Sequence, residues 1–351
     1  MYNDSVFLDQ KQFHWAFLAH LGYNMWADPV RDKRGVPGIP QSLTQVCAED
    51  HLRFDLELWH KTTKDLAAAG CNMIVLDIGE GLQYESHPEI ACKGAWTKDI
   101  LQEEIFNLKM LGIEAIPKLN FSACHDEWMG EYGRMVSTTP YYRFCEDVIT
   151  EVCEVFGNPR LFHLGMDEET AAHQRNYDYT VIRQNDLWWH DFYHLVDCVE
   201  RENVRPWIWS DYMWNYPDVF LRKMPKSVVQ SNWYYGMGFD ESGIRPSENA
   251  GEHAKNVLSC FETLDRHGFD QVPTGSNYST SGNMEALTKF CTANISNERL
   301  LGFMQTPWVM THEGGHNRMR IWESVEKMAA AKVWYDSFSA HGSSANGSGK
   351  N

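Results

Sequence analysis

The chain has 351 residues, 43% of them hydrophobic and 13% aromatic, and a formal net charge of −17. This length can bury a large core, and α/β barrels commonly use this much chain as one domain. The negative charge and the absence of a long run of lysine or arginine argue against nucleic acid or an anionic membrane as a partner, and no apolar run is long enough to cross a membrane.

Short apolar runs alternate with helical patterns along the whole chain. The runs predict strands over residues 14–22, 71–79, 113–120, 161–166, 206–211, 227–234, 270–275 and 301–308. Each strand precedes a predicted helix, over residues 49–70, 97–112, 141–157, 186–202, 217–224, 252–267, 283–293 and 318–336. Thr97 as an N-cap and Gly70 as a C-terminal stop support two of these helices.

Strand–helix alternation predicts either an open doubly wound sheet or a closed (β/α)8 TIM barrel. Eight pairs without a break in composition favour the barrel, as a single catalytic domain over residues 1–338. The Gly/Ser/Asn-rich residues 339–351 are predicted to form a disordered tail.

In such barrels the functional side chains lie after the C-terminal ends of the strands. The fourth strand carries the sharpest signal, because "LFHLGMDEET" (161–170) ends in Asp167, Glu168 and Glu169. Two adjacent carboxylates in a partly desolvated site repel each other, which raises the pKa of one and suits it to general acid catalysis. The alternative is that these acids open the next helix, where its dipole favours them.

The same segment, "FHLGMDEE", resembles the H-x-G-G-D-E signature of the family 20 glycoside hydrolases, the β-N-acetylhexosaminidases. The segments "CNMIVLDIGEGLQYE" (71–85), "GIEAIPKLNFSACH" (112–125), "VVQSNW" and "LGFMQTPW" are similar to the second, third, sixth and eighth strand regions of that family. The resemblance therefore spans most of a (β/α)8 barrel in the same order, although only the fourth-strand motif is specific.

The resemblance implies an exo-acting retaining glycosidase that removes a terminal β-linked N-acetylhexosamine by substrate-assisted catalysis. Asp167 would orient the 2-acetamido group, and Glu168 would be the acid/base. Substrate contacts would come from the side chains of His125, Trp209, Asp211, Trp233, Tyr278, Trp308 and Glu313. No cofactor or metal is implied, the partner is a carbohydrate substrate, and the oligomeric state is not indicated.

The seventh segment, "DQVPTGSNYSTSGN" (270–283), supports that mechanism independently. A conventional retaining barrel needs a second carboxylate as nucleophile. This segment has no carboxylate after Asp270, which lies at the wrong end of the strand. A substrate that supplies its own nucleophile explains why this segment carries no second carboxylate.

Several positions depart from the family pattern, and they leave the sugar identity open. Met166 replaces the second glycine of the signature, and no arginine follows the first strand, where His20 or Asn24 are the substitutes. The seventh strand has Tyr278-Ser279-Thr280 where the family has Y-L-D, and the eighth has Trp308-Val309-Met310 where it has W-x-E. A noncatalytic carbohydrate-binding barrel, or a glycosidase with another sugar specificity, is therefore the alternative.

The segment His312-Glu313-Gly314-Gly315-His316 also spells the H-E-x-x-H pattern of zinc peptidases. That chemistry needs both histidines one turn apart on a helix. Two glycines and a position between the eighth strand and the last helix predict a loop instead, so a zinc peptidase is disfavoured.

Nine scattered cysteines without a C-x-x-C pair argue against a disulfide framework. Reduced, buried cysteines and a start, "MYNDSVFLDQKQF", without a signal pattern predict a cytoplasmic location. A signal peptide removed from the sequence would leave the same appearance.

Overall fold

Strands and helices alternate along the chain as the sequence predicts. The computed structural model describes residues 12–26, 46–175, 177 and 180–345. Its parallel strands are β1 (His14–His20), β2 (Met73–Asp77), β3 (Glu114–Lys118), β4 (Leu161–His163), β5 (Arg205–Trp209), β6 (Val229–Ser231), β7 (Thr274–Ser276) and β8 (Gly302–Thr306).

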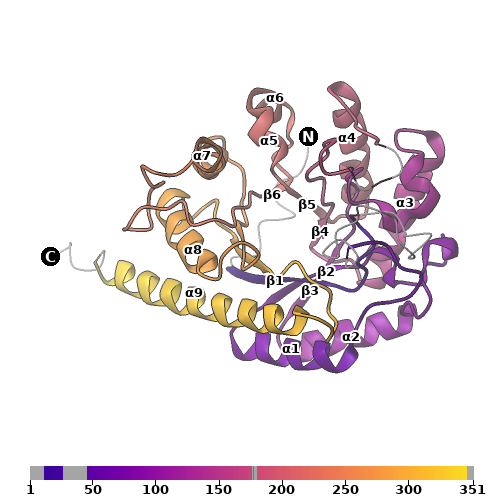
Figure 1. Ribbon diagram of the computed structural model, residues 1–351, viewed down its shortest axis with the longest axis horizontal. Helices are drawn as coiled ribbons and strands as arrows, with labels where there is room; N and C mark the ends of the chain where they lie inside the picture. The colour runs from indigo at the N-terminus through magenta and orange to yellow at the C-terminus, as the bar shows by residue number, and fades with distance from the viewer. Residues whose placement is uncertain (1–11, 27–45, 176, 178–179, 346–351) are drawn as a thin grey trace.

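Helices follow every strand and surround the sheet (Figure 1). They are α1 (Leu56–Ala68), α2 (Lys98–Met110), α3 (Thr139–Val155), α4 (Asp186–Arg201), α5 (Tyr212–Asn215), α6 (Pro217–Lys223), α7 (Glu252–Arg266), α8 (Asn283–Asn294) and α9 (Asn317–Ala345).

The sheet closes into a (β/α)8 barrel, which confirms the predicted fold. Its strand order is β6-β5-β4-β3-β2-β1-β8-β7. Isolated bridges between Gln230 and Gln271 and between Trp233 and Thr274 join β6 to β7. Because all strands run parallel, their C-terminal ends meet at one mouth, where barrel enzymes carry their sites.

Two apolar clusters fill the fold. The larger lies between the strands and the helices and includes Phe17, Ile74, Phe162 and Ile208. The smaller fills the barrel interior with alternate side chains of the same strands, such as Leu18, Val75 and Trp207. Trp209 belongs to this inner cluster, and the partly buried Trp233 and Trp308 pack against it.

Most predicted boundaries lie within three residues of the observed ones, and three differ by more. Helix α1 begins at Leu56, because the side chain of Asp55 accepts a hydrogen bond from the backbone N–H of Leu58 and caps the helix there. Strand β7 begins at Thr274, four residues later than the predicted strand. Helix α9 continues to Ala345, past the expected end of the barrel at residue 338; residues 346–351 of the predicted tail lie outside the described part.

All nine cysteines are free thiols, and only Cys92 is not buried. This agrees with the prediction that they form no disulfide framework. Among the described residues, no helix combines the length and the apolar character needed to cross a membrane.

Candidate active site

The backbone at the end of β4 turns sharply toward the barrel mouth. Gly165, Met166 and Glu168 have φ values of 71°, 72° and 56°, all in the left-handed region. A Cβ atom on Gly165 would lie 2.1 Å from Oδ1 of Asn120, so only glycine fits there. At Met166 a long side chain occupies a backbone conformation that favours glycine, which costs on the order of 1 kcal/mol or more.

This turn brings the two neighbouring acids together at one histidine. His125 Nε2 lies 3.3 Å from Asp167 Oδ2 and 3.4 Å from Glu168 Oε2. The Asn120 side chain donates to Asp167 Oδ1 at 2.8 Å, which fixes the carboxylate from the other side. The structure thus unites three residues that the sequence assigned to the site, and adds Asn120.

Asp211, at the end of β5, completes what we call the carboxylate cluster: Asp167, Glu168, Asp211 and His125. Its Oδ2 accepts the backbone N–H of Glu168 at 2.9 Å, and its Oδ1 lies 3.4 Å from the indole Nε1 of Trp233. Asp211 therefore supports the left-handed backbone of Glu168.

The carboxyl groups of the cluster have unequal proton affinities. Burial by itself raises the pKa of Asp167, but the charge of His125 and hydrogen bonds from His125 and Asn120 outweigh it and lower that pKa. Burial and then the charge of Asp167 raise the pKa of Asp211 to about 8. The sequence argument expected a raised pKa within the 167–168 pair, whereas the raised value found here belongs to Asp211.

His125 is the positive partner of the cluster. Burial alone lowers its pKa, yet Cys124 and Asp167 raise it well above the ordinary value of a histidine. With the Cys124 thiol itself neutral, since burial raises its pKa to about 12, we attribute the charge of His125 mainly to Asp167. At neutral pH an imidazolium then lies between Asp167 and Glu168.

The three predicted tryptophans lie around the cluster at the top of the barrel interior. Trp233 contacts Asp211, as described, and the rings of Trp209 and Trp308 are 5.8 Å apart. Trp209 is only 1% exposed, so it forms the floor of the mouth. Trp233 and Trp308 are partly buried and can present faces to a ligand.

Two predicted site residues are exposed on the loops after β7 and β8. The Tyr278 side chain is 59% exposed and packs under Arg320, whose guanidinium carbon lies 5.4 Å from the ring centroid. Glu313 is exposed and forms an ion pair with Arg318 at 3.1 Å. The family resemblance assigned both residues to the site, and a match in sequence does not fix where a loop side chain points.

The two proposed substitutes for the missing arginine are engaged in the fold. The Asn24 carboxamide bonds the backbone of Glu49 and accepts from Arg53. The buried His20 ring lies 3.5 Å from Asp77 and faces Trp308 at 5.7 Å between centroids.

Sequence reasoning missed two aromatic residues at the mouth. Tyr235 stacks on Trp233 with ring centroids 4.9 Å apart, and its hydroxyl accepts from Trp308 Nε1 at 2.9 Å. Burial, opposed in part by that hydrogen bond, raises its pKa well above the ordinary value, and Glu168, Asp167 and Asp211 add to the shift. Trp26 lies with its ring 6.0 Å from His125 and 6.2 Å from Trp308. The signal for Tyr235 was "NWYYG", directly after the sixth strand.

The H-E-G-G-H segment is irregular, as predicted. It precedes α9, and His312 Nδ1 accepts from the backbone N–H of Gly314 at 2.9 Å, which closes a tight turn. Its two histidines therefore do not share a helical face.

Among the described residues, His125, Asp167 and Glu168 form one group that could hold a metal ion, and the half-buried Glu49 with the exposed Asp50 and His51 forms another. A cation at the first group would have to displace the proton that His125 holds between the carboxylates, because only neutral imidazole binds metals.

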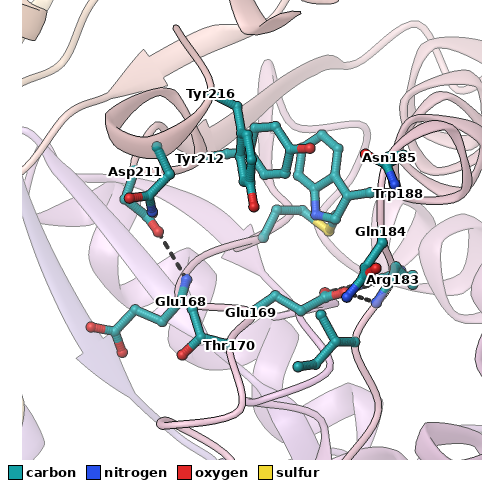
Figure 2. A pocket seen from close by; sticks show the side chains of 13 residues that line it. Glu168, Glu169, Thr170, Arg183, Gln184, Asn185, Trp188, Asp211, Tyr212 and Tyr216 are labelled. Atoms are coloured by element: carbon teal, nitrogen blue, oxygen red, sulfur yellow. Dashed lines mark hydrogen bonds and ion pairs between the residues drawn. The ribbon is translucent and has the colours of Figure 1, made fainter.

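A cavity of about 230 Å³ adjoins the carboxylate cluster (Figure 2). We call it the side pocket; it lies between the segment after β4, the start of α4 and helix α5. Its lining residues are Met166, Glu168, Glu169, Thr170, Ile182, Arg183, Gln184, Asn185, Trp188, Asp211, Tyr212, Asn215 and Tyr216.

The third acid of the motif, Glu169, has a structural role beside this pocket. Arg183 Nη2 donates to Glu169 Oε2 at 2.6 Å, and its Nη1 lies 3.3 Å from Asp191 at the inner face of α4. The same guanidinium donates to the backbone oxygen of Phe121 at 2.8 Å. This buried network ties the segments after β3 and β4 to α4, so it holds the wall of the pocket in place.

The sequence matches no protein-family model and no curated protein sequence. In structure the chain is similar to a β-N-acetylhexosaminidase from Bacteroides fragilis, with TM-score 0.58 and 13% identity over 97% of this chain and 72% of that one. It is also similar to an exo-β-N-acetylglucosaminidase from Vibrio harveyi in complex with N-acetylglucosamine, with TM-score 0.58 and 13% identity over 92% of this chain and 55% of that one.

A third similar structure is a mutant β-hexosaminidase from Streptomyces plicatus in complex with its product, with TM-score 0.57 and 10% identity over 92% of this chain and 68% of that one. The chain spans only 46% of a Flavobacterium johnsoniae chitobiase and 55% of the Vibrio enzyme. These likenesses establish a shared barrel fold.

Proposed function

We propose that the protein is a glycosidase, a divergent relative of the family 20 β-N-acetylhexosaminidases, that removes a terminal β-linked N-acetylhexosamine. One observation carries the proposal: Asp167 and Glu168 converge on His125 at a barrel mouth lined by indole rings. The fold shared with enzymes of that family supports it independently.

The remaining acids of the barrel favour a substrate-assisted reaction. Asp270 precedes β7 and pairs with Arg205 at 2.7 Å and Arg299 at 2.9 Å, so it is far from the mouth in topology and already neutralised. Without a nucleophile from β7, the 2-acetamido oxygen of the substrate is the group that attacks the anomeric carbon. The C–O bond to the leaving group breaks as a cyclic oxazolinium ion forms.

Each acid then has a distinct task. Asp167, held ionised by His125 and Asn120, accepts the acetamido N–H and stabilises the positive charge of the ring. Glu168 in its protonated form donates to the leaving oxygen, and as a carboxylate it then takes a proton from the water that opens the oxazolinium. The positive charge of His125 lies between the two acids and offsets their mutual repulsion.

Tyr235 is the donor to the acetamido oxygen in this proposal, a role that the family resemblance implies for Tyr278. Its hydroxyl oxygen already accepts from Trp308, so its own proton is available for the acetamido oxygen. Trp26, Trp233 and Trp308 offer ring faces to the C–H faces of the sugar.

A panel of aryl glycosides with and without the 2-acetamido group tests this function. Cleavage confined to the acetamido sugars is the expected result, and faster cleavage of plain glucosides would contradict substrate assistance. The second candidate, a noncatalytic sugar-binding barrel, is separated by Glu168→Gln. An enzyme loses turnover in this variant while it still binds ligand, whereas a binding protein has no turnover in the wild type.

A further inference from the structure

The carboxylate of Glu168 lies between two imidazole rings. Its Oε2 is 3.4 Å from Nε2 of His125, and its Oε1 is 3.4 Å from Nε2 of His173 in the turn after β4. Among the described residues, these rings are the only hydrogen-bonding or ion-pairing partners of this carboxylate. Figure 2 shows the carboxylate pointing away from the side pocket, so the pocket residues do not orient it. One contact at each oxygen fixes the plane of the carboxyl group.

The His173 ring is itself oriented by a neighbour. Its Nδ1 lies 2.8 Å from the hydroxyl of Thr170, and that hydroxyl also accepts the backbone N–H of His173 at 3.3 Å. A carboxylate can only accept hydrogen bonds, so Nε2 of His173 carries the hydrogen when Glu168 is ionised. Nδ1 then accepts from the Thr170 hydroxyl. The hydrogen bonds therefore run in one direction, from Thr170 through His173 to Glu168.

The turn that carries His173 is anchored although the side chain is 45% exposed. The next residue, Gln174, is buried, and its carboxamide donates to the backbone oxygen of Val181 at 2.6 Å and accepts the backbone N–H of Val181 at 2.7 Å. The backbone N–H of Gln174 bonds to the backbone oxygen of Thr170 at 3.3 Å. These bonds hold the His173 ring near Glu168 before a substrate binds.

The two histidines differ in what they serve. His125 contacts both Asp167 and Glu168, so a change at His125 disturbs both acids. His173 contacts Glu168 and not Asp167, so a change at His173 acts on one acid alone. A partly exposed pair of this kind adds little to stability. Its effect is expected in the direction of proton transfer and not in folding.

We propose that His173 is a positioning residue for the acid/base. Supported by Thr170, it holds the carboxyl group of Glu168 in the orientation from which its proton passes to the leaving oxygen. This inference rests on the proposed function, in which Glu168 is the acid. A carboxyl group that can rotate away presents its proton less often in the reactive geometry, which slows the step.

The test compares two aryl β-glycosides of N-acetylhexosamine, which differ in how much the leaving oxygen needs a proton. The phenyl glycoside depends on acid catalysis, whereas the 2,4-dinitrophenyl glycoside leaves as a stable anion. The variants are His173→Ala, the conservative His173→Gln, and Thr170→Val. His190→Ala is the matched control, because His190 is an exposed histidine of α4 that contacts the ring of Tyr142 and not Glu168.

In His173→Ala we expect kcat/KM for the phenyl glycoside to fall about tenfold and that for the dinitrophenyl glycoside to fall less than about twofold. Thr170→Val should shift the ratio of the two in the same direction by a smaller factor, and His190→Ala should leave it unchanged. A glutamine carboxamide can donate to Glu168 and accept from Thr170, so His173→Gln should recover most of the loss.

Equal losses on the two glycosides in His173→Ala would indicate a merely structural role and overturn the proposal. An unchanged rate on the phenyl glycoside would do the same. A loss in His173→Gln as large as that in His173→Ala would show that the hydrogen bond is not what matters.

NMR of the imidazole nitrogens keeps this test separate from that of the proposed function. Glu168→Ala should change the ¹⁵N shift of Nε2 in His173 and leave the shifts of His190 unchanged; the His173 signals are assigned by their loss in His173→Gln. If the wild type cleaves neither glycoside, the catalytic proposal fails, while the contact stands if that change is seen. An unchanged Nε2 shift rejects the positioning role whatever the activity.

Discussion

Asp211 is the residue whose protonation most affects the charge of the mouth near neutral pH. Its pKa of about 8 means that it is protonated at pH 7 and becomes a further negative charge beside Asp167 above that value. That charge attracts the proton of Glu168 and so hinders its transfer to the leaving oxygen. We therefore expect kcat/KM to fall on the alkaline side with a midpoint near pH 8.

In Asp211→Asn the group cannot ionise, so the alkaline fall should move to higher pH while activity at pH 6 is largely retained. Asp218→Asn, a change at an exposed aspartate in the first turn of α6, is the control and should leave the profile unchanged. A pH–rate profile of Asp211→Asn that overlays the wild type would show that another group causes the fall.

Replacing Tyr235 or Tyr278 by phenylalanine should have different effects on kcat. Tyr235→Phe removes a hydroxyl next to Trp308 and the carboxylate cluster, and loss of one such donor to a developing oxyanion lowers kcat by on the order of 10²-fold. Tyr278→Phe removes an exposed hydroxyl and should leave kcat within about twofold. Kinetics on an acetamido glycoside decide between them, and a large loss in Tyr278→Phe would restore the assignment made from sequence.

At the level of elements, the end of β4 positions the acids through one glycine. Gly165→Ala would place a Cβ atom 2.1 Å from Oδ1 of Asn120, the residue that also holds Asp167. Gly157, at the end of α3, has a similar φ of 69°, but its added Cβ would meet nothing within 4 Å. Comparing the two alanine variants separates the cost of the left-handed backbone from the cost of the clash with Asn120.

We expect Gly157→Ala to lower the free energy of unfolding by about 1 kcal/mol, the usual cost of a left-handed alanine. Gly165→Ala should cost clearly more and should also lower kcat, because Asn120 must move away from Asp167. Urea denaturation and kinetics on both variants measure this. Equal losses of stability and of kcat in the two variants would mean that Asn120 can move away from the added Cβ atom without affecting either quantity.

The elements themselves were largely predictable, because each depends on a local pattern. Buried parallel strands are short apolar runs, and Thr97 caps α2 as its sequence indicates. The predicted start of α1 at residue 49 was wrong, because the side chain of Asp55 accepts the backbone N–H of Leu58 and caps the helix there. The apolar residue Leu52 before this cap fits the helical period and extended the predicted helix too far.

At the scale of the whole molecule, the site was predictable only in part. Asp167 and Glu168 lie four and five residues after β4 and His125 seven residues after β3, and their contacts with one another and with Asn120 hold them at the mouth. Tyr278 lies only two residues after β7, so distance from the strand does not decide the direction of a side chain. Its direction depends on contacts such as that with Arg320, which joins segments 42 residues apart that no local pattern brings together.

Below the mouth, a buried charge pair links stability to the proposed chemistry. Lys118 on β3 is fully buried and bonds to the carboxylate of Asp77 on β2. Burial by itself raises the pKa of Asp77, but Lys118 and His20 outweigh it and lower that pKa. The charge of Lys118 also contributes to the lowered pKa of Asp167. The same lysine therefore stabilises Asp77 inside the barrel and the carboxylate of Asp167 at the mouth.

Lys118→Met leaves the Asp77 charge buried without its partner, and we expect a loss of about 3–5 kcal/mol in the free energy of unfolding at pH 7. Lys61→Met, which breaks an exposed pair with Asp65, should cost less than about 1 kcal/mol.

A lowered native pKa gives Asp77 a stabilising contribution above the unfolded pKa of about 4, which disappears as the pH falls further. The loss caused by Lys118→Met should therefore shrink between pH 7 and pH 4, because the unpaired Asp77 then takes up a proton. Replacing Asp77 by leucine in the same variant should recover much of the stability at pH 7. If the double variant is no more stable than the single one, packing rather than the stranded charge accounts for the loss.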